Sequence, residues 1–254
     1  MSRPTAGGSF RVAVALLTRL PVGRHDTDPD DDWRDARVFF PVVGALVAGA
    51  GIAVRTAAAP LLGTGTATVL AVGAMVLATG ALHEDGLADS ADGLWGGQTP
   101  ERRLAIMHDS RIGTFGVVAL VLVLALRFAL LAPLAPADFA KAVLAAHVLG
   151  RAAGVAVTAT LPAAGAGLGS KVTGPARWTT VCAVALGALV TGAYAVNRWF
   201  WAPVGAALLA AAAARSLARR RIGGINGDLI GASILVAEVT VMAVVVGLLR
   251  HGIG

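Results

Sequence analysis

The chain has 254 residues, of which 56% are hydrophobic and only 14% are charged, and its mean hydropathy is +0.74. Soluble domains are roughly one-quarter charged and disordered chains have low hydrophobicity, so this composition excludes an ordinary cytosolic domain and a disordered protein. The net charge of +6 is typical of a membrane protein with basic cytoplasmic loops, and we expect no nucleic-acid partner. The single cysteine, Cys182, excludes an internal disulfide and a multi-cysteine metal site.

Seven apolar segments follow one another along the chain, and most approach the roughly 20 residues that a spanning helix needs. They cover residues 39–60, 66–82, 116–134, 139–161, 178–196, 199–214 and 229–249. Before them, residues 10–20 contain Arg11 and Arg19 and stop at Pro21, which indicates an interfacial helix. A signal peptide is the alternative, disfavoured by the two arginines and by the lack of a small-residue cleavage site. We therefore predict an all-α fold, a polytopic transmembrane helix bundle of about seven spans plus an N-terminal interfacial helix, forming a single integral membrane domain over residues 1–254.

The distribution of Lys and Arg predicts the orientation of this bundle. With the N-terminus inside, 15 of the 21 Lys and Arg residues fall in inner segments, 3 in outer segments and 3 within spans. We therefore expect a multi-pass protein of the cell (inner) membrane.

An acidic run begins where the second span ends. Residues 83–93 read His-Glu-Asp-Gly-Leu-Ala-Asp-Ser-Ala-Asp-Gly, and ionisable residues are expensive to place at the end of a span. In a helix, Asp85, Asp89 and Asp92 would fall within about 60° of arc. Such carboxylates repel one another unless a cation or protons neutralise them, and hard oxygen ligands suit Mg²⁺ or Mn²⁺. We predict that these residues bind metal and act in catalysis together with His83; the alternative is a solvated loop end.

A second polar cluster lies before the third span. Asp109 could complete a metal shell, and Arg111 could bind phosphate through two parallel hydrogen bonds. Gly113 opens the next span, where free N–H groups and the helix dipole favour an anion, so we predict that Arg111 and Gly113 bind substrate. The alternative is a basic loop with a helix cap.

A third cluster, residues 223–232, contains Gly227 and Asp228. The topology returns it to the same face of the membrane as the first two, so the sequence predicts one site, facing the cytoplasm, to which Gly227 contributes a substrate contact and Asp228 a metal ligand. The glycine-rich stretch 165–171 lacks the Gly-Lys-Ser/Thr of a phosphate-binding loop and is predicted to be a flexible connector.

Two ionisable positions lie within the spans. Arg151 shares a helix face with His147 and could reach a substrate phosphate or form an ion pair in the membrane. Glu238, about ten residues into the last span, is a functional candidate by its position, or a buried partner of Arg127 or Arg151.

Carboxylates for a divalent cation and arginines for anions favour phosphoryl transfer. The motifs that carry this chemistry resemble those of the cobalamin synthase family, adenosylcobinamide-GDP ribazoletransferase. The resemblance covers residues 83–93, 106–116 and 223–232, together with Thr-Arg-Leu-Pro at 18–21 and Phe-Pro-Val-Val-Gly at 40–44.

The resemblance implies a Mg²⁺-dependent inner-membrane enzyme. It would join adenosylcobinamide-GDP to α-ribazole or α-ribazole 5′-phosphate and release GMP, with the 5′-oxygen of ribazole, or the equivalent nucleophile of the phosphorylated form, attacking the phosphorus next to cobinamide. On this basis Asp85, Asp89 and Asp92 hold Mg²⁺, and Asp109 or Asp228 completes the shell. Arg111 neutralises the transferring phosphate, and one carboxylate or His83 acts as base. Membrane lipid is the other expected partner, and a homo-oligomer stays open.

Two rival functions remain. A CDP-alcohol phosphotransferase also uses an Asp-rich metal site at the membrane boundary, but its Asp-Gly-x-x-Ala-Arg segment is absent, since Leu-Trp-Gly-Gly follows Asp92-Gly93. A transporter would use the ionisable residues within the spans, but its site should lie near the middle of the bilayer.

Overall fold

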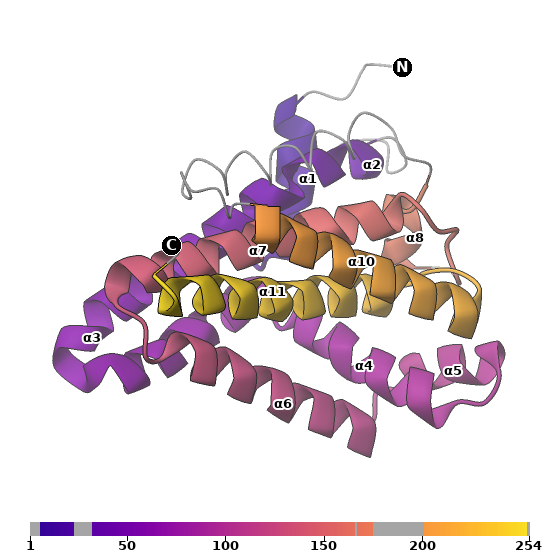
Figure 1. Ribbon diagram of the computed structural model, residues 1–254. Helices are drawn as coiled ribbons and strands as arrows, with labels where there is room; N and C mark the ends of the chain where they lie inside the picture. Colours follow the sequence, from indigo (N-terminus) through magenta and orange to yellow (C-terminus); the bar gives the residue numbers. More distant parts are fainter. Residues whose placement is uncertain (1–5, 23–31, 166, 175–200, 253–254) are drawn as a thin grey trace.

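The computed structural model describes residues 6–22, 32–165, 167–174 and 201–252 (Figure 1). This part of the chain is helical, without strands, and contains one isolated parallel β-bridge between Ala163 and Ile225. Its helices are α1 (Ala6–Leu17), α2 (Asp32–Ala36), the 3₁₀ turn Arg37–Phe39, α3 (Phe40–Thr79), α4 (Leu82–Gly96), α5 (Pro100–Met107), α6 (Thr114–Leu131), α7 (Pro136–Thr158), α8 (Leu168–Val172), α10 (Trp201–Ile222) and α11 (Gly227–Arg250).

Five helical segments of the described part are long and apolar enough to cross a membrane. They are Trp33–Thr79, which includes α3, and the helices α6, α7, α10 and α11. The predicted all-α polytopic membrane bundle is therefore confirmed. The predicted span 178–196 lies outside the described residues, so the count of seven stays a prediction.

Helix α3 is a hairpin rather than one long rod. Its backbone leaves the helical region at Gly63, with φ 77° and ψ 160°, a conformation open to glycine. Beyond this point the chain returns along itself, because Arg55 Nε donates to Thr68 Oγ1 at 3.1 Å and Gly51 packs against Met75. In a straight helix, residues 51 and 75 would lie about 36 Å apart. The two arms correspond to the predicted segments 39–60 and 66–82.

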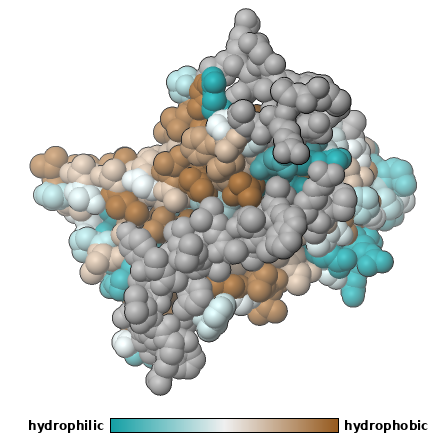
Figure 2. Space-filling view, turned by 90° about the horizontal axis from the view of Figure 1, so that it is seen from above, coloured by the Kyte–Doolittle hydropathy of each residue, from teal (hydrophilic) through white to brown (hydrophobic). Residues whose placement is uncertain are grey.

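Helices α7 and α11 form the centre of the bundle (Figure 1). Helix α11 also packs against α4, α10 and α6. Glycines allow the close approach: a Cβ on Gly150 would lie 2.6 Å from the Glu238 side chain, and a Cβ on Gly154 would lie 2.5 Å from Ile234. Figure 2 shows hydrophilic side chains at the right edge, the end where Figure 1 places α5 and the C-terminal end of α10.

The N-terminal helix α1 lies across the bundle (Figure 1). Its 12 residues span about 18 Å, less than the roughly 30 Å of a bilayer core. It buries Val12, Ala13 and Leu17, while Arg11 donates to the carbonyl of Val22 on the exposed side. The helix begins and ends a few residues earlier than the predicted 10–20, and its length agrees with a helix that does not cross the membrane.

Candidate active site

The acidic run forms α4, as its spacing predicts. The turn before it places both Gly80 and Ala81 in the left-handed region, and the helix begins at Leu82. On one stripe of α4, Asp85 is exposed, Asp89 is half-buried and Asp92 is buried. The three carboxylates therefore share a face but differ in their surroundings.

Asp92 caps the next membrane helix. Its carboxylate accepts hydrogen bonds from the N–H of Gly113 at 2.7 Å and the N–H of Gly116 at 2.9 Å. A Cβ on either glycine would lie 2.5 Å from a carboxylate oxygen. An anion does occupy the N-terminus of α6, as the dipole argument predicts, but in this structure it belongs to the protein. Metal binding by Asp92 and substrate binding by Gly113 stay predictions, and the structure gives both residues a structural role.

Asp228 reaches the carboxylates of α4 from the first turn of α11. The Asn226 side chain caps this helix by accepting from Leu229 N at 3.0 Å, and its Nδ2 donates to Asp228 Oδ2 at 2.9 Å. The backbone of Asp228 packs on Gly86, where a Cβ would lie 2.7 Å from the Asp228 carbonyl oxygen. The glycine within the acidic motif thus permits the close crossing of α4 and α11.

The electrostatics of Asp89 show the convergence of these carboxylates. Burial, and then the negative charges of Asp85, Asp228 and Asp92, raise the pKa of Asp89 to about 7. His108, at the end of α5, opposes this shift. The mutual repulsion predicted from the spacing is therefore present, and it includes Asp228 from a distant part of the sequence.

Asp109 and Arg111 pair with each other. Arg111 donates to both carboxylate oxygens of Asp109, with Nη2 at 2.6 Å from Oδ2 and Nε at 3.0 Å from Oδ1. These hydrogen bonds lower the pKa of Asp109 to about 2. The Arg111 side chain is 87% exposed. The structure thus places Asp109 on its arginine, and a substrate phosphate would have to compete with that carboxylate for Arg111.

A cavity of about 330 Å³ lies beside the carboxylates. Its wall is formed by Leu16, Leu17, Phe40, Leu82, His83, Asp85, Met107, His108, Gly167, Gly169, Val172, Asn226, Gly227, Asp228, Ile230, Gly231 and Ile234. Of the predicted site residues, it brings together His83, Asp85, Gly227 and Asp228. His108 and Asn226 also line the cavity and were not predicted as site residues. His108 directly precedes Asp109, and the Asn-Gly-Asp pattern of a helix cap was the available signal for Asn226.

The glycine-rich loops meet beside this cavity. Ala164 N donates to Ile225 O at 2.8 Å and Ile225 N donates to Pro162 O at 2.9 Å. A Cβ on Gly169 would lie 2.5 Å from Gly227 N. The loop before α11 therefore contacts the chain just before the predicted connector and, at Gly169, near its end, and the flexibility of the connector stays a prediction.

The donor set fits a hard cation in kind, but it does not form a closed shell. Among the described residues, no group of three or more His, Cys, Asp or Glu side chains is close enough to hold a metal ion. Three of the five predicted ligands have protein partners: Asp92 on α6, Asp109 on Arg111, and Asp228 through one oxygen on Asn226. Asp85, Asp89 and Asp228 keep the charge repulsion that a divalent cation would relieve.

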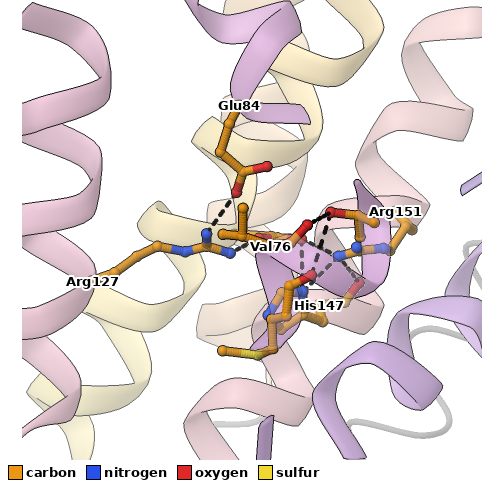
Figure 3. A network of polar contacts seen from close by, with 8 residues as sticks. Val76, Glu84, Arg127, His147 and Arg151 are labelled. Atoms are coloured by element: carbon orange, nitrogen blue, oxygen red, sulfur yellow. Dashed lines mark hydrogen bonds and ion pairs between the residues drawn. The ribbon is translucent and has the colours of Figure 1, made fainter. Parts of the chain in front are cut away.

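A separate ion network lies within the helix bundle (Figure 3). Glu238 on α11 contacts Arg127 Nη2 at 2.7 Å and His147 Nδ1 at 2.9 Å, and it also pairs with Arg151. Arg127 Nη1 contacts Glu84 at 2.9 Å, which ties α4 to α6, α7 and α11. The expected ion pairs of Glu238 are confirmed. Arg151 is fully buried in this network and does not line the cavity, and its predicted contact with substrate stays a prediction.

Comparison with known proteins identifies the family. The model of the cobalamin-5-phosphate synthase (CobS) family matches residues 9–246. The chain belongs to this family. An adenosylcobinamide-GDP ribazoletransferase of Bradyrhizobium diazoefficiens is 42% identical over 241 residues, covering 92% of each chain. A protein of the same name from Ralstonia pickettii is 39% identical over 91% of each chain. Another, from Vibrio cholerae, is 35% identical over 95% of this chain and 94% of the relative. No solved structure matches.

The CobS family is the one that the motifs indicate, so the resemblance is confirmed, together with its enzyme class, a transferase of cobalamin biosynthesis. The family match extends from α1 to α11. It therefore includes the three polar clusters and the cavity between them.

Proposed function

We propose that this protein is a Mg²⁺-dependent transferase that joins adenosylcobinamide-GDP to α-ribazole, or to α-ribazole 5′-phosphate, and releases GMP. The observation that carries the proposal is the convergence of Asp85, Asp89 and Asp228 beside a cavity, in a chain whose relatives are named for this transfer. Phosphoryl transfer requires positioning and charge neutralisation more than covalent chemistry.

We assign Asp85, Asp89 and Asp228 to Mg²⁺, which would have to bring these carboxylates closer together than they lie in this structure. Their oxygens are the hard ligands that this cation prefers. When bound, Mg²⁺ would supply charge neutralisation on the diphosphate. Asn226 orients Asp228 through the 2.9 Å hydrogen bond to its carboxylate, and Gly86 lets Asp228 approach α4.

The nucleophile is a ribose hydroxyl of ribazole other than the 5′-hydroxyl. The family description is cobalamin-5-phosphate synthase, which supports a 5′-oxygen that carries phosphate and a new bond formed by another ribose oxygen. This replaces the expectation of attack by the 5′-oxygen. The ribose oxygen forms a bond to the phosphorus next to cobinamide, the bond from that phosphorus to the GMP oxygen breaks, GMP leaves with the electron pair, and the hydroxyl proton passes to a base.

A carboxylate suits the role of base better than His83. Burial, and then the charge of Arg151, lower the pKa of His83 to about 3, which makes its imidazole a weak proton acceptor. Asp85, on the same helix, is exposed and lines the cavity. We assign Arg111 to the transferring phosphate. Its side chain is highly exposed, so it can give up its hydrogen bonds to Asp109 and bind the phosphate instead.

The cytoplasmic face is the side that we propose for this site. The site end of the described bundle carries Arg102, Arg103, Arg111, Arg219, Arg220 and Arg221, against Lys141 and Arg250 near the opposite end. Lys and Arg concentrate on the cytoplasmic side of membrane proteins. This placement gives the site access to the soluble nucleotide substrates in the cell.

A product assay tests the proposal. Liposome-held protein is incubated with adenosylcobinamide-GDP, Mg²⁺ and either α-ribazole or its 5′-phosphate, and GMP and the cobalamin product are measured by mass. Both products should appear, and EDTA should abolish them. If correctly inserted protein forms neither, the proposal fails; CDP-activated lipid and vesicle uptake then test the phosphotransferase and transporter alternatives.

A further inference from the structure

The cavity beside the carboxylates has an apolar interior. Leu16 and Leu17 reach it from α1, Phe40 from the start of α3, and Ile230 and Ile234 from α11. These segments are far apart in sequence, so the cavity is built by the fold rather than by one loop. An apolar cavity favours an apolar ligand group, because the removal of apolar surface from water stabilises the complex.

The polar part of the described wall consists of carboxylates, two histidines and an asparagine. Among the described residues, no Lys or Arg lines the cavity. Asp85 and Asp228 do, and they lie close enough to affect each other electrostatically. A phosphate or diphosphate in the apolar part of the cavity, away from Mg²⁺ on Asp85 and Asp228, would therefore meet apolar carbon and no Lys or Arg side chain of the described wall.

The size of the cavity limits which part of the two substrates can enter it. A cavity of about 330 Å³ lies at the lower end of the roughly 300–1,000 Å³ of small-molecule sites. The corrin ring with its side chains is too large for it, and the guanosine diphosphate is anionic. The remaining part is the dimethylbenzimidazole base of ribazole, which is aromatic, uncharged and carries two methyl groups.

We propose that this cavity binds the base of the acceptor nucleoside, α-ribazole or its 5′-phosphate, with the base among Leu16, Phe40 and Ile234. The inference rests on the proposed function and adds a subsite to it. The ribose then faces Asp85 and Asp228, where a hydroxyl can lose its proton during attack. In this arrangement helix α1 covers the bound base through Leu16 and Leu17.

Cavity-filling and cavity-enlarging variants test the proposal. Leu16→Trp should raise the KM for α-ribazole at least about tenfold, a factor of the size expected from changing a few carbons in an apolar pocket, and the KM for adenosylcobinamide-GDP should stay unchanged. Leu16→Ala should also raise the KM for α-ribazole, because contacts are lost. The matched control is Leu61→Trp, at a position 85% exposed near the turn of α3, with both KM values at the wild-type level.

A smaller acceptor provides a positive signature. With a nucleoside of benzimidazole that lacks the two methyl groups, Leu16→Trp should recover much of its kcat/KM relative to the wild type. α-Ribazole and its 5′-phosphate should show the same pattern, because they carry the same base. If Leu16→Trp instead raises the KM for adenosylcobinamide-GDP and leaves that for α-ribazole unchanged, the proposed occupant is wrong.

A binding measurement separates this inference from the proposed function. Equilibrium dialysis of α-ribazole against detergent-held wild-type protein and the Leu16→Trp variant needs no turnover. Binding to the wild type that weakens in the variant supports the subsite even if no GMP is formed. GMP formation by the wild type together with equal binding to both proteins leaves the transferase in place and overturns the subsite.

Discussion

The ion network around Glu238 provides a stability prediction that can be worked from the structure. Two carboxylates, Glu84 and Glu238, balance two guanidinium groups, Arg127 and Arg151, inside the bundle. Glu238 lies about 17 Å along α11 from its first residue, far from either end of the helix. The substitution Glu238→Gln removes one negative charge, keeps the side-chain shape and leaves the network with an excess positive charge.

The expected destabilisation is about 2–5 kcal/mol. Breaking a buried ion pair by neutralising one partner costs about 3–5 kcal/mol in soluble proteins. Polar contacts between membrane helices average about 0.6 kcal/mol each, and Glu238 contacts three partners, which gives the lower value of about 2 kcal/mol. For a chain of this size, about 2–4 °C in Tm accompany each kcal/mol, so the apparent Tm should fall by at least about 4 °C.

Thermal unfolding in detergent, followed by tryptophan fluorescence at one scan rate, measures this shift. Glu101→Gln is the matched control, because Glu101 is exposed on α5, and its apparent Tm should change by less than about 2 °C. The double variant Arg127→Gln/Glu238→Gln restores charge balance between Glu84 and Arg151. Its loss of stability should be smaller than the sum of the two single losses by at least about 1 kcal/mol. Additive losses, or a Glu238→Gln variant as stable as the control, would refute the reasoning.

Three further substitutions test the packing around the site. Asp92→Ala should lower the free energy of unfolding by about 1–2 kcal/mol, because the N-terminus of α6 loses its cap; an unchanged apparent Tm would contradict this. Gly86→Ala places a Cβ 2.7 Å from the Asp228 carbonyl oxygen, which displaces Asp228 from α4 and should raise the half-saturating Mg²⁺ concentration in the GMP assay. The control Gly49→Ala, whose Cβ would have no atom within 4 Å, should leave this concentration unchanged, and equal values for both variants would contradict the proposed role of Gly86. Ala81→Gly should leave the apparent Tm unchanged or raise it, because Ala81 has φ 57°. A left-handed alanine costs roughly 1–2 kcal/mol, whereas glycine loses about 0.5–1 kcal/mol through backbone entropy. A fall of more than about 1 kcal/mol in the free energy of unfolding would contradict this prediction.

Helices and their faces could be predicted because each depends on local residues. Apolar length located the spans, and the spacing of Asp85, Asp89 and Asp92 placed them on one stripe of α4. The approach of Asp228 to this stripe was predicted only from the number and orientation of the membrane spans, which return residues 223–232 to the same face of the membrane. The hairpin of α3 was foreseen as two segments, since polar and glycine-rich residues interrupt the apolar pattern around Gly63.

The partners of individual charges could not be read from spacing. Asp92 and Asp89 are three residues apart on the same face, but α6 covers only Asp92. Arg111 has Asp109 beside it, whereas the burial of Arg151 depends on the close packing of α7 and α11 at Gly150 and Gly154. The apolar cavity was missed because its wall combines α1, α3, α8 and α11, and no local pattern marks residues that meet only in three dimensions.

The central claim is that the carboxylates of α4 and Asp228 hold the Mg²⁺ of the transfer. The most direct measurement is the Mg²⁺ dependence of GMP release by the Asp89→Asn variant, with Asp109→Asn as the matched control on the exposed Arg111 pair. The account predicts that Asp89→Asn loses at least about a hundredfold in turnover, because a bound metal contributes several kcal/mol of charge stabilisation, at an unchanged apparent Tm. Asp109→Asn should keep the wild-type half-saturating Mg²⁺ concentration. Wild-type turnover and Mg²⁺ dependence in Asp89→Asn would contradict it.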